Sequence, residues 1–182
     1  MEFIEQEIPG VFIIEPKLFG DERGYFTETY RKDLFDKHIG KTDFIQDNES
    51  RSRYGVLRGL HFQKGEYSQA KLVRVIEGKV LDVAVDLRKS SPTFGKYLMV
   101  ELSAENKRQF FIPRGFAHGF AVLSPTATFI YKVDNVYAPE SEATLLYNDP
   151  RIGIQWPIPE EDILLSEKDR KGIPFAETTY FE

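Results

Sequence analysis

The alternation of apolar and polar residues from Lys71 to Arg88 is the feature that most limits the possible folds. A period of two places successive side chains on opposite faces of a strand. The run divides at Gly78 into two blocks, and the second block separates its residues by face, with Leu81, Val83, Val85 and Leu87 on one face and Asp82 and Asp86 on the other. The pattern predicts two paired antiparallel strands with one buried face.

Further short strands are predicted along most of the chain, separated by turns rich in Gly, Pro and Asn. They are expected at residues 11–14, 25–29, 58–63, 96–102, 108–112, 117–123 and 127–133, with a polar turn at residues 50–54. Helical patterns are confined to residues 30–39 and to a capped segment, Ser166–Asp169. Many short strands with little helix predict an all-β sandwich or small barrel, and the length fits one domain over residues 1–182.

Composition excludes several classes of function. The net charge is −5 and no block of Lys and Arg is present, which argues against a nucleic-acid polymer as partner. Cysteine is absent, so disulfides, thiolate nucleophiles and thiolate metal sites are excluded. The acidic start of the chain has no signal-peptide pattern, and no apolar run reaches the length of a membrane span. We therefore expect a cytoplasmic protein without a membrane partner.

Four ionisable side chains fall on strand faces that the alternation points inward. They are His61, Lys71, His118 and Tyr131. Each could be a hydrogen-bonded core residue or a side chain that reaches a rim. Burying several of them without partners would cost stability, so together they indicate a polar pocket inside the barrel.

A metal site is the alternative interpretation of the two histidines. The run Pro113–His118 matches the Pro-x-Gly-x-x-His pattern of cupin barrels, and His61 could add a second ligand. However, Phe62 and Gln63 stand where a second histidine of a His-x-His pair is expected. Divalent ions in proteins normally have three or four protein ligands. We therefore expect neither a metal nor another cofactor.

Longer motifs identify a family. The chain resembles the dTDP-4-dehydrorhamnose 3,5-epimerases, metal-free enzymes with a cupin-type jelly-roll fold. The motifs are in order and span nearly the whole chain: Asp21–Glu28, Gln46–Asn48, Val56–Gln63, Lys71–Val73, Phe111–Phe120, Tyr131–Lys132, Tyr137–Glu142 and Ser166–Asp169.

The resemblance implies a reaction and roles for four residues. The substrate is a dTDP-4-keto-6-deoxyhexose, and dTDP-4-dehydro-6-deoxy-D-glucose becomes dTDP-4-dehydro-L-rhamnose by proton transfer at C3 and C5. His61 matches the general base, Asp169 orients it, Tyr131 matches the acid on the opposite face, and Lys71 would lie near the C4 oxygen. A capping box would also account for Asp169 without any catalytic role.

The resemblance also implies binding positions and a homodimer. The binding positions are Arg23, Phe26, Glu28, Gln46, Asp47, Asn48, Arg58, Lys71, His118, Tyr137, Glu142 and Lys168. Arginine forks suit phosphate oxygens, and flat aromatic rings suit a base such as thymine. In this family N-terminal strands cross between protomers, so Arg23, Phe26 and Glu28 would serve the partner's site.

Several alternatives stay open at this point. Four other functions fit parts of the pattern: a relative that epimerises one carbon, a 3,4-ketoisomerase, a non-catalytic barrel that binds sugar nucleotides and a metal-dependent cupin oxygenase. Strict alternation also places Arg58 on the face opposite His61, unless Gly59 introduces a bulge.

Overall fold

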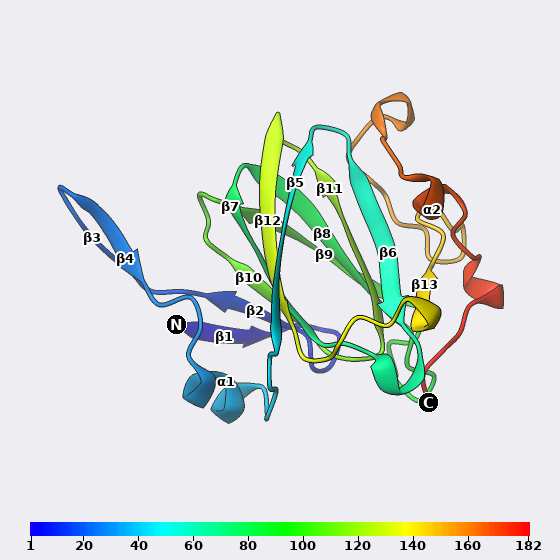
Figure 1. The fold of residues 1–182 in the computed structure, drawn as a ribbon, viewed down its shortest axis with the longest axis horizontal. Coiled ribbons are helices and arrows are strands. Elements are labelled where there is room, and N and C mark those ends of the chain that lie inside the picture. Colours follow the sequence, from blue (N-terminus) through cyan, green and yellow to red (C-terminus); the bar gives the residue numbers. More distant parts are fainter.

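Two antiparallel sheets face each other in the computed structural model, which describes residues 1–182 (Figure 1). One sheet has six strands in the order β1-β2-β10-β7-β12-β5, and the other has five in the order β13-β6-β11-β8-β9. Strands β3 and β4 form a separate hairpin. The predicted all-β, cupin-type sandwich is therefore confirmed.

The strands are β1 (Glu2–Glu5), β2 (Phe12–Glu15), β3 (Leu18–Asp21), β4 (Gly24–Thr27), β5 (Gln46–Arg53), β6 (Leu57–Gln63), β7 (Lys71–Glu77), β8 (Lys79–Asp86), β9 (Tyr97–Ser103), β10 (Gln109–Ile112), β11 (Phe116–Val122), β12 (Thr126–Val133) and β13 (Glu142–Thr144). The helices are α1 (Lys32–His38) and α2 (Glu167–Arg170), with short 3-10 turns at Gly65–Tyr67, Pro139–Ser141, Glu160–Asp162 and Phe175–Glu177.

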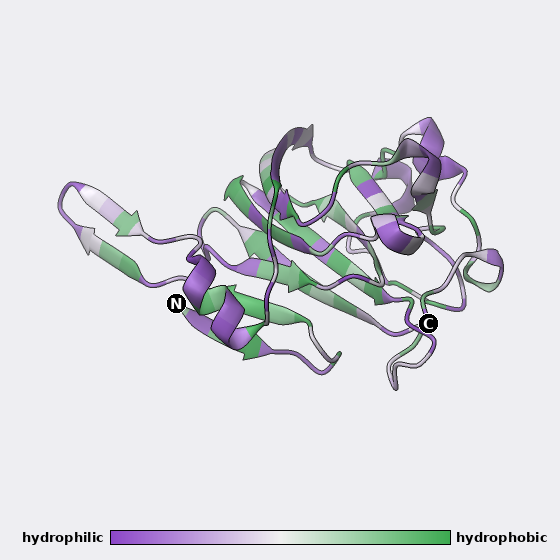
Figure 2. Ribbon diagram, turned by 60° about the horizontal axis from the view of Figure 1, so that its bottom comes forward, coloured by the Kyte–Doolittle hydropathy of each residue, from purple (hydrophilic) through white to green (hydrophobic).

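The main hydrophobic core lies between the two sheets. Its largest side chains include Phe110, Phe120 and Phe129, and the rings of Phe120 and Phe129 stack 4.2 Å apart. A second cluster covers the outer face of the five-stranded sheet, where Val83, Val85 and Leu87 pack beneath the C-terminal segment. Figure 2 shows the apolar residues concentrated on the strands of the sandwich, whereas α1 is mostly hydrophilic. Both faces of β8 are therefore covered.

The predicted pairing within residues 71–88 is wrong. Strands β7 and β8 follow each other in the chain but belong to different sheets, because β7 pairs with β10 and β12 while β8 pairs with β11 and β9. The chain turns from one sheet into the other at Gly78, which has a φ of 74°. A side chain there would put its Cβ 2.0 Å from the carbonyl oxygen of Thr126, so the corner requires glycine.

The predicted polar turn at residues 50–54 is also wrong. Residues 46–53 form β5, the edge strand beside β12. Uncharged and charged polar residues alternate along this strand. Asn48, Ser50 and Ser52 are less exposed than the charged residues between them. Charged residues are common on edge strands, and they conceal the strand from a search for apolar periodicity. The other predicted strands and both helices are found within a few residues of their expected bounds.

The hairpin of β3 and β4, residues 18–27, projects from the body of the molecule, and we call it the arm (Figure 1). Its apolar side chains Leu18, Phe19, Tyr25 and Phe26 are exposed. An isolated two-stranded hairpin is at best marginally stable in water. The arm therefore leaves most of its apolar surface in solvent, although Lys107 lies over the Tyr25 ring, 4.6 Å from its centre.

The structure contains no helix that is both long enough and apolar enough to cross a membrane.

Candidate active site

Residues from both sheets line a cavity of about 270 Å³ at one end of the sandwich. Three of the four residues predicted to face inward meet there, namely His61, Lys71 and Tyr131. The other lining residues are Gln46, Asn48, Phe62, Gln63, Gln69, Val133, Tyr137 and Glu142. The cavity therefore combines an imidazole, a phenol and an amine.

His61 is held on the wall formed by β6. Its Nε2 lies 2.5 Å from Oδ1 of Asp169, and the imidazole is 28 % exposed whereas the carboxylate is 4 % exposed. Burial raises the pKa of Asp169, but the hydrogen bond and charge of His61, together with Ser166 and Lys168, outweigh it, and the pKa lies below its usual value. A carboxylate only accepts, so Nε2 carries the proton and Nδ1 presents its lone pair. The ring is thus held by Nε2, with Nδ1 free of side-chain partners.

Asp169 owes its position to the short helix α2. The Ser166 hydroxyl accepts a hydrogen bond from the backbone N–H of Asp169 at 3.1 Å, which caps the helix. The backbone of Asp169 thus takes part in the cap, while its side chain binds His61. The two interpretations of Asp169 therefore coexist.

Lys71 and Tyr131 belong to the opposite sheet, on the neighbouring strands β7 and β12. Burial lowers the pKa of Lys71 to about 8, although Asp82 and Glu142 favour its charged form. Burial raises the pKa of the Tyr131 phenol, and the positive charge of Arg58 opposes that shift. The phenol thus keeps its proton at neutral pH, and it faces His61 from the other side of the cavity.

A polar network lies at the edge of the cavity. Lys168 donates to Glu142 at 2.5 Å, and the hydroxyl of Tyr137 donates to the other carboxylate oxygen at 3.2 Å. Burial raises the pKa of Glu142, but the hydrogen bond and charge of Lys168, together with Tyr137 and His61, outweigh it, and the pKa lies below its usual value. These contacts bring three predicted binding residues, Tyr137, Glu142 and Lys168, beside the histidine.

The open question about Arg58 is settled by an irregularity at Gly59. In the ladder with β11, His61 lies opposite His118 and Arg58 opposite Phe120, with a register shift between them. Because His118 and Phe120 share a face of β11, the shift brings Arg58 and His61 onto one face. Gly59 has a φ of 127°, in the left-handed region that favours glycine.

Gly59→Ala should destabilise the protein strongly. The added Cβ would lie 2.6 Å from Cα of Gly119 and 2.9 Å from the carbonyl oxygen of His118, so both strands must separate. We expect the free energy of unfolding to fall by roughly 2–3 kcal/mol, measured by urea denaturation. Gly24→Ala is the matched control, because Gly24 has a φ of 133° but no atom within 4 Å of the added Cβ. Equal losses in the two variants would contradict the steric explanation.

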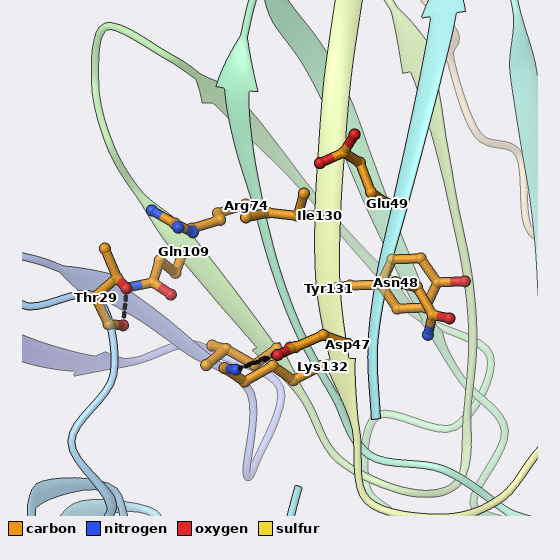
Figure 3. Close-up of a pocket in the computed structure, with 10 residues that line it drawn as sticks. Thr29, Asp47, Asn48, Glu49, Arg74, Gln109, Ile130, Tyr131 and Lys132 are labelled. Atoms are coloured by element: carbon orange, nitrogen blue, oxygen red, sulfur yellow. Dashed lines mark hydrogen bonds and ion pairs between the residues drawn. The ribbon is translucent and has the colours of Figure 1, made fainter. Parts of the chain in front are cut away.

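Some predicted binding residues lie away from the cavity of their own chain. Arg23, Phe26 and Glu28 lie on or next to the arm; Arg23 pairs with Asp21, and Phe26 is 65 % exposed. Asp47 binds Lys132 at 2.8 Å in a separate pocket on the outer side of the six-stranded sheet (Figure 3). Its neighbour Asn48 lies beside Tyr131 and lines both this pocket and the cavity.

His118 lies behind the cavity, with its Nε2 bound to Asp82. Asp82 was predicted on the outer face of its strand and is instead fully buried between the sheets. The sequence analysis also gave no role to Gln63 and Gln69, which line the cavity. Their side-chain amides donate to backbone carbonyls of residues 135 and 136. No pattern in the sequence predicts these hydrogen bonds. No group of three or more His, Asp or Glu side chains has a geometry able to hold a metal ion.

Comparison with known proteins gives one consistent family. The family model described as dTDP-4-dehydrorhamnose 3,5-epimerase matches residues 5–177. The dTDP-4-dehydrorhamnose 3,5-epimerase of Shigella flexneri is 54 % identical over 182 residues, which cover 100 % of this chain and 99 % of the relative.

Solved structures agree with this relationship. The dTDP-4-dehydrorhamnose 3,5-epimerase of Elizabethkingia anophelis NUHP1 has a TM-score of 0.96 and 55 % identity, and the match covers 99 % of each chain. The dTDP-6-deoxy-D-glucose-3,5-epimerase of Legionella pneumophila Philadelphia 1, solved in complex with dTDP-4-keto-L-rhamnose, has a TM-score of 0.93 and 49 % identity, with 98 % of this chain and 94 % of that chain covered. A histidine, a tyrosine and a lysine converge in one cavity, and the likeness extends over the whole chain, so this protein belongs to the dTDP-4-dehydrorhamnose 3,5-epimerase family.

Proposed function

We propose that this enzyme, an isomerase of a nucleotide-linked sugar, converts dTDP-4-dehydro-6-deoxy-D-glucose to dTDP-4-dehydro-L-rhamnose with His61 as base and Tyr131 as acid. The observation that carries the assignment is their position on opposite walls of one cavity, His61 on β6 and Tyr131 on β12. Inverting a carbon requires that the proton leave one face of the sugar ring and return to the other. Residues 1–182 act as a single epimerase domain in this proposal, because one core joins the two sheets.

Lys71 supplies the stabilisation that a histidine alone cannot. A proton next to a ketone is less acidic than an imidazolium by roughly a dozen pK units, which corresponds to on the order of 15 kcal/mol. An ammonium beside the C4 oxygen acts where negative charge develops, and a preorganised donor in a site that excludes water is worth several kcal/mol. The reaction needs no further group, and the absence of a metal or cofactor stays a prediction.

Exchange with heavy water tests the function directly. The protein is incubated with dTDP-4-dehydro-6-deoxy-D-glucose in deuterium oxide, and C3 and C5 are followed by NMR. Deuterium at both carbons supports the proposal. Deuterium at one carbon indicates a single-carbon epimerase, and ligand binding without exchange indicates a binding barrel.

We also propose a homodimer in which each arm completes the partner's site. The exposed apolar side chains of the arm support this arrangement, as does the place of Arg23 in the turn between β3 and β4 of the projecting hairpin (Figure 1). The arm would bring Arg23 to the diphosphate and Phe26 to the thymine, with Glu28 and, from the receiving chain, Asp47 nearby. A cytoplasmic location stays a prediction from the sequence.

Mixed dimers of two inactive variants should recover activity. A dimer of one His61→Ala chain and one Arg23→Ala chain has one site with both residues intact if the arms cross. Random assembly should restore about a quarter of the wild-type exchange rate, since about half the dimers are mixed and half their sites are intact. Arg23→Ala mixed with Arg23→Glu is the control and should restore nothing. A mixture as inactive as its components would contradict the exchange of arms.

A further inference from the structure

Asp82 is a buried carboxylate that the steps above do not use. Its side chain on β8 is 0 % exposed, and its two oxygens lie 2.9 and 3.0 Å from a single nitrogen, Nε2 of His118. A carboxylate can accept from several donors, and a buried charge with few partners costs stability. A further positively charged partner would therefore offset the cost of burying Asp82 between the sheets.

The strand register aligns Asp82 with the catalytic histidine. Asp82 lies opposite Phe120 on β11, and His118 lies opposite both Ala84 on β8 and His61 on β6. Residues diagonal to each other on paired strands share a face and are within reach of long side chains. Asp82, His118 and His61 therefore form one row across three strands, on the face toward the cavity.

Lys71 faces this row from the other sheet. The charged and titratable groups around it are Asp82 on β8, His118 on β11, His61 on β6, Tyr131 on β12, Glu142 on β13 and Lys168 on α2. Burial lowers the pKa of Lys71 to about 8, Asp82 opposes this most strongly and Glu142 next, whereas Lys168 lowers it further. Glu142 is already paired with Lys168. Burial raises the pKa of Asp82, and His118 and Lys71 oppose that shift by favouring the carboxylate, so Asp82 is the main acidic group that faces the ammonium.

We propose that Asp82 is a positioning residue that fixes the orientation of His118 and holds Lys71 in its ammonium form inside the cavity. This inference rests on the proposed function, in which that ammonium stabilises the enolate oxygen at C4. Because Asp82 accepts from Nε2, a neutral His118 presents the lone pair of Nδ1. Burial lowers the pKa of His118, against the opposing effect of Asp82, so the neutral form prevails at pH 7.

Asp82→Asn removes the charge and keeps an oxygen that can accept from His118. Lys71 is protonated below its pKa, so wild-type kcat/KM for solvent exchange should fall as the pH rises through about 8. Without Asp82 this fall should move to lower pH by about one unit, while the rate at pH 6 stays within a few-fold. Asp43→Asn, which removes an exposed charge paired with Lys32, should leave the profile unchanged.

Direct titration of Lys71 separates this inference from the proposed function. In protein with carbon-13-labelled lysine, the Lys71 signal is identified by its loss in Lys71→Met and followed against pH. Its midpoint should lie lower in Asp82→Asn, and in Asp82→Ser if the first variant does not fold. An unchanged midpoint would overturn the role of Asp82, even in an active enzyme. The opposite outcome is a lower Lys71 midpoint in Asp82→Asn together with a wild-type protein that shows no solvent exchange. That outcome would support the electrostatic role of Asp82 and contradict the epimerase function.

Discussion

His61→Ala should abolish hydrogen exchange at both C3 and C5. Nδ1 of His61 is the free nitrogen of a ring whose other nitrogen is held by Asp169 at 2.5 Å, and His61 lines the cavity. Positioned general bases contribute about 10²–10⁴-fold, and here the same base serves both carbons. We therefore expect the exchange rate to fall by about 10³-fold at each carbon, measured by NMR in deuterium oxide.

A second substitution separates the loss of the base from the loss of a structural contact. His61→Ala leaves the buried carboxylate of Asp169 without its donor, which costs about 1–3 kcal/mol of stability. His61→Gln places an amide nitrogen where Nε2 was, so it should retain stability and remain inactive. His38→Ala is the matched control, because His38 lies on α1 and stacks on Phe3, with its ring centre 4.7 Å away. An active and folded His61→Ala protein would require a different base.

Period-two alternation located much of this site from the sequence. It placed Lys71 and Tyr131 on faces that line the cavity, and the structure brings both there with His61. It succeeded because β7 and β12 have one face toward the cavity and alternate regularly over the residues concerned. The pairing of His61 with Asp169 joins residues 108 positions apart, and only the family resemblance predicted it.

Alternation failed where both faces of a strand are buried. On β8 the apolar residues Val83 and Val85 pack under the C-terminal segment, and the inner face carries Asp82. The rule that apolar residues face the core therefore selected the wrong face for the cavity. It was also uninformative at Gly59, because a register shift cannot be counted from side-chain type. The alternation on β8 is present as predicted, but its polar face lies toward the cavity and its apolar face lies toward the C-terminal segment.

The arm shows a different limit. Its sequence predicts a turn and a strand correctly, but β3 and β4 pair only with each other in a hairpin that projects from the body. Whether Arg23 and Phe26 serve a site depends on a second protomer, which no local pattern encodes. Recovery of activity in mixed dimers would assign Arg23 to the site of the partner chain.

Tyr131→Phe should separate proton removal from inversion. The substitution leaves His61 and Asp169 in place, so hydrogens at C3 and C5 should still leave for solvent. What is lost is the phenolic proton on the opposite wall, which burial keeps in place by raising the pKa of Tyr131. We expect product formation to fall by about 10²-fold or more, with inversion at C5 most affected, while loss of hydrogen from the recovered substrate falls far less.

The ratio of the two rates makes this prediction decisive. Both are read from one NMR time course in deuterium oxide, as deuterium in recovered substrate and as epimerised product. A proton returned by His61 restores the original configuration, so the variant should accumulate deuterated substrate that the wild type converts onward. Tyr97→Phe is the matched control, since its hydroxyl binds the carbonyl of Gly153 outside the cavity. Equal loss of both rates would make Tyr131 a binding group, and unchanged inversion would assign the acid to another cavity residue such as Tyr137, whose hydroxyl binds Glu142.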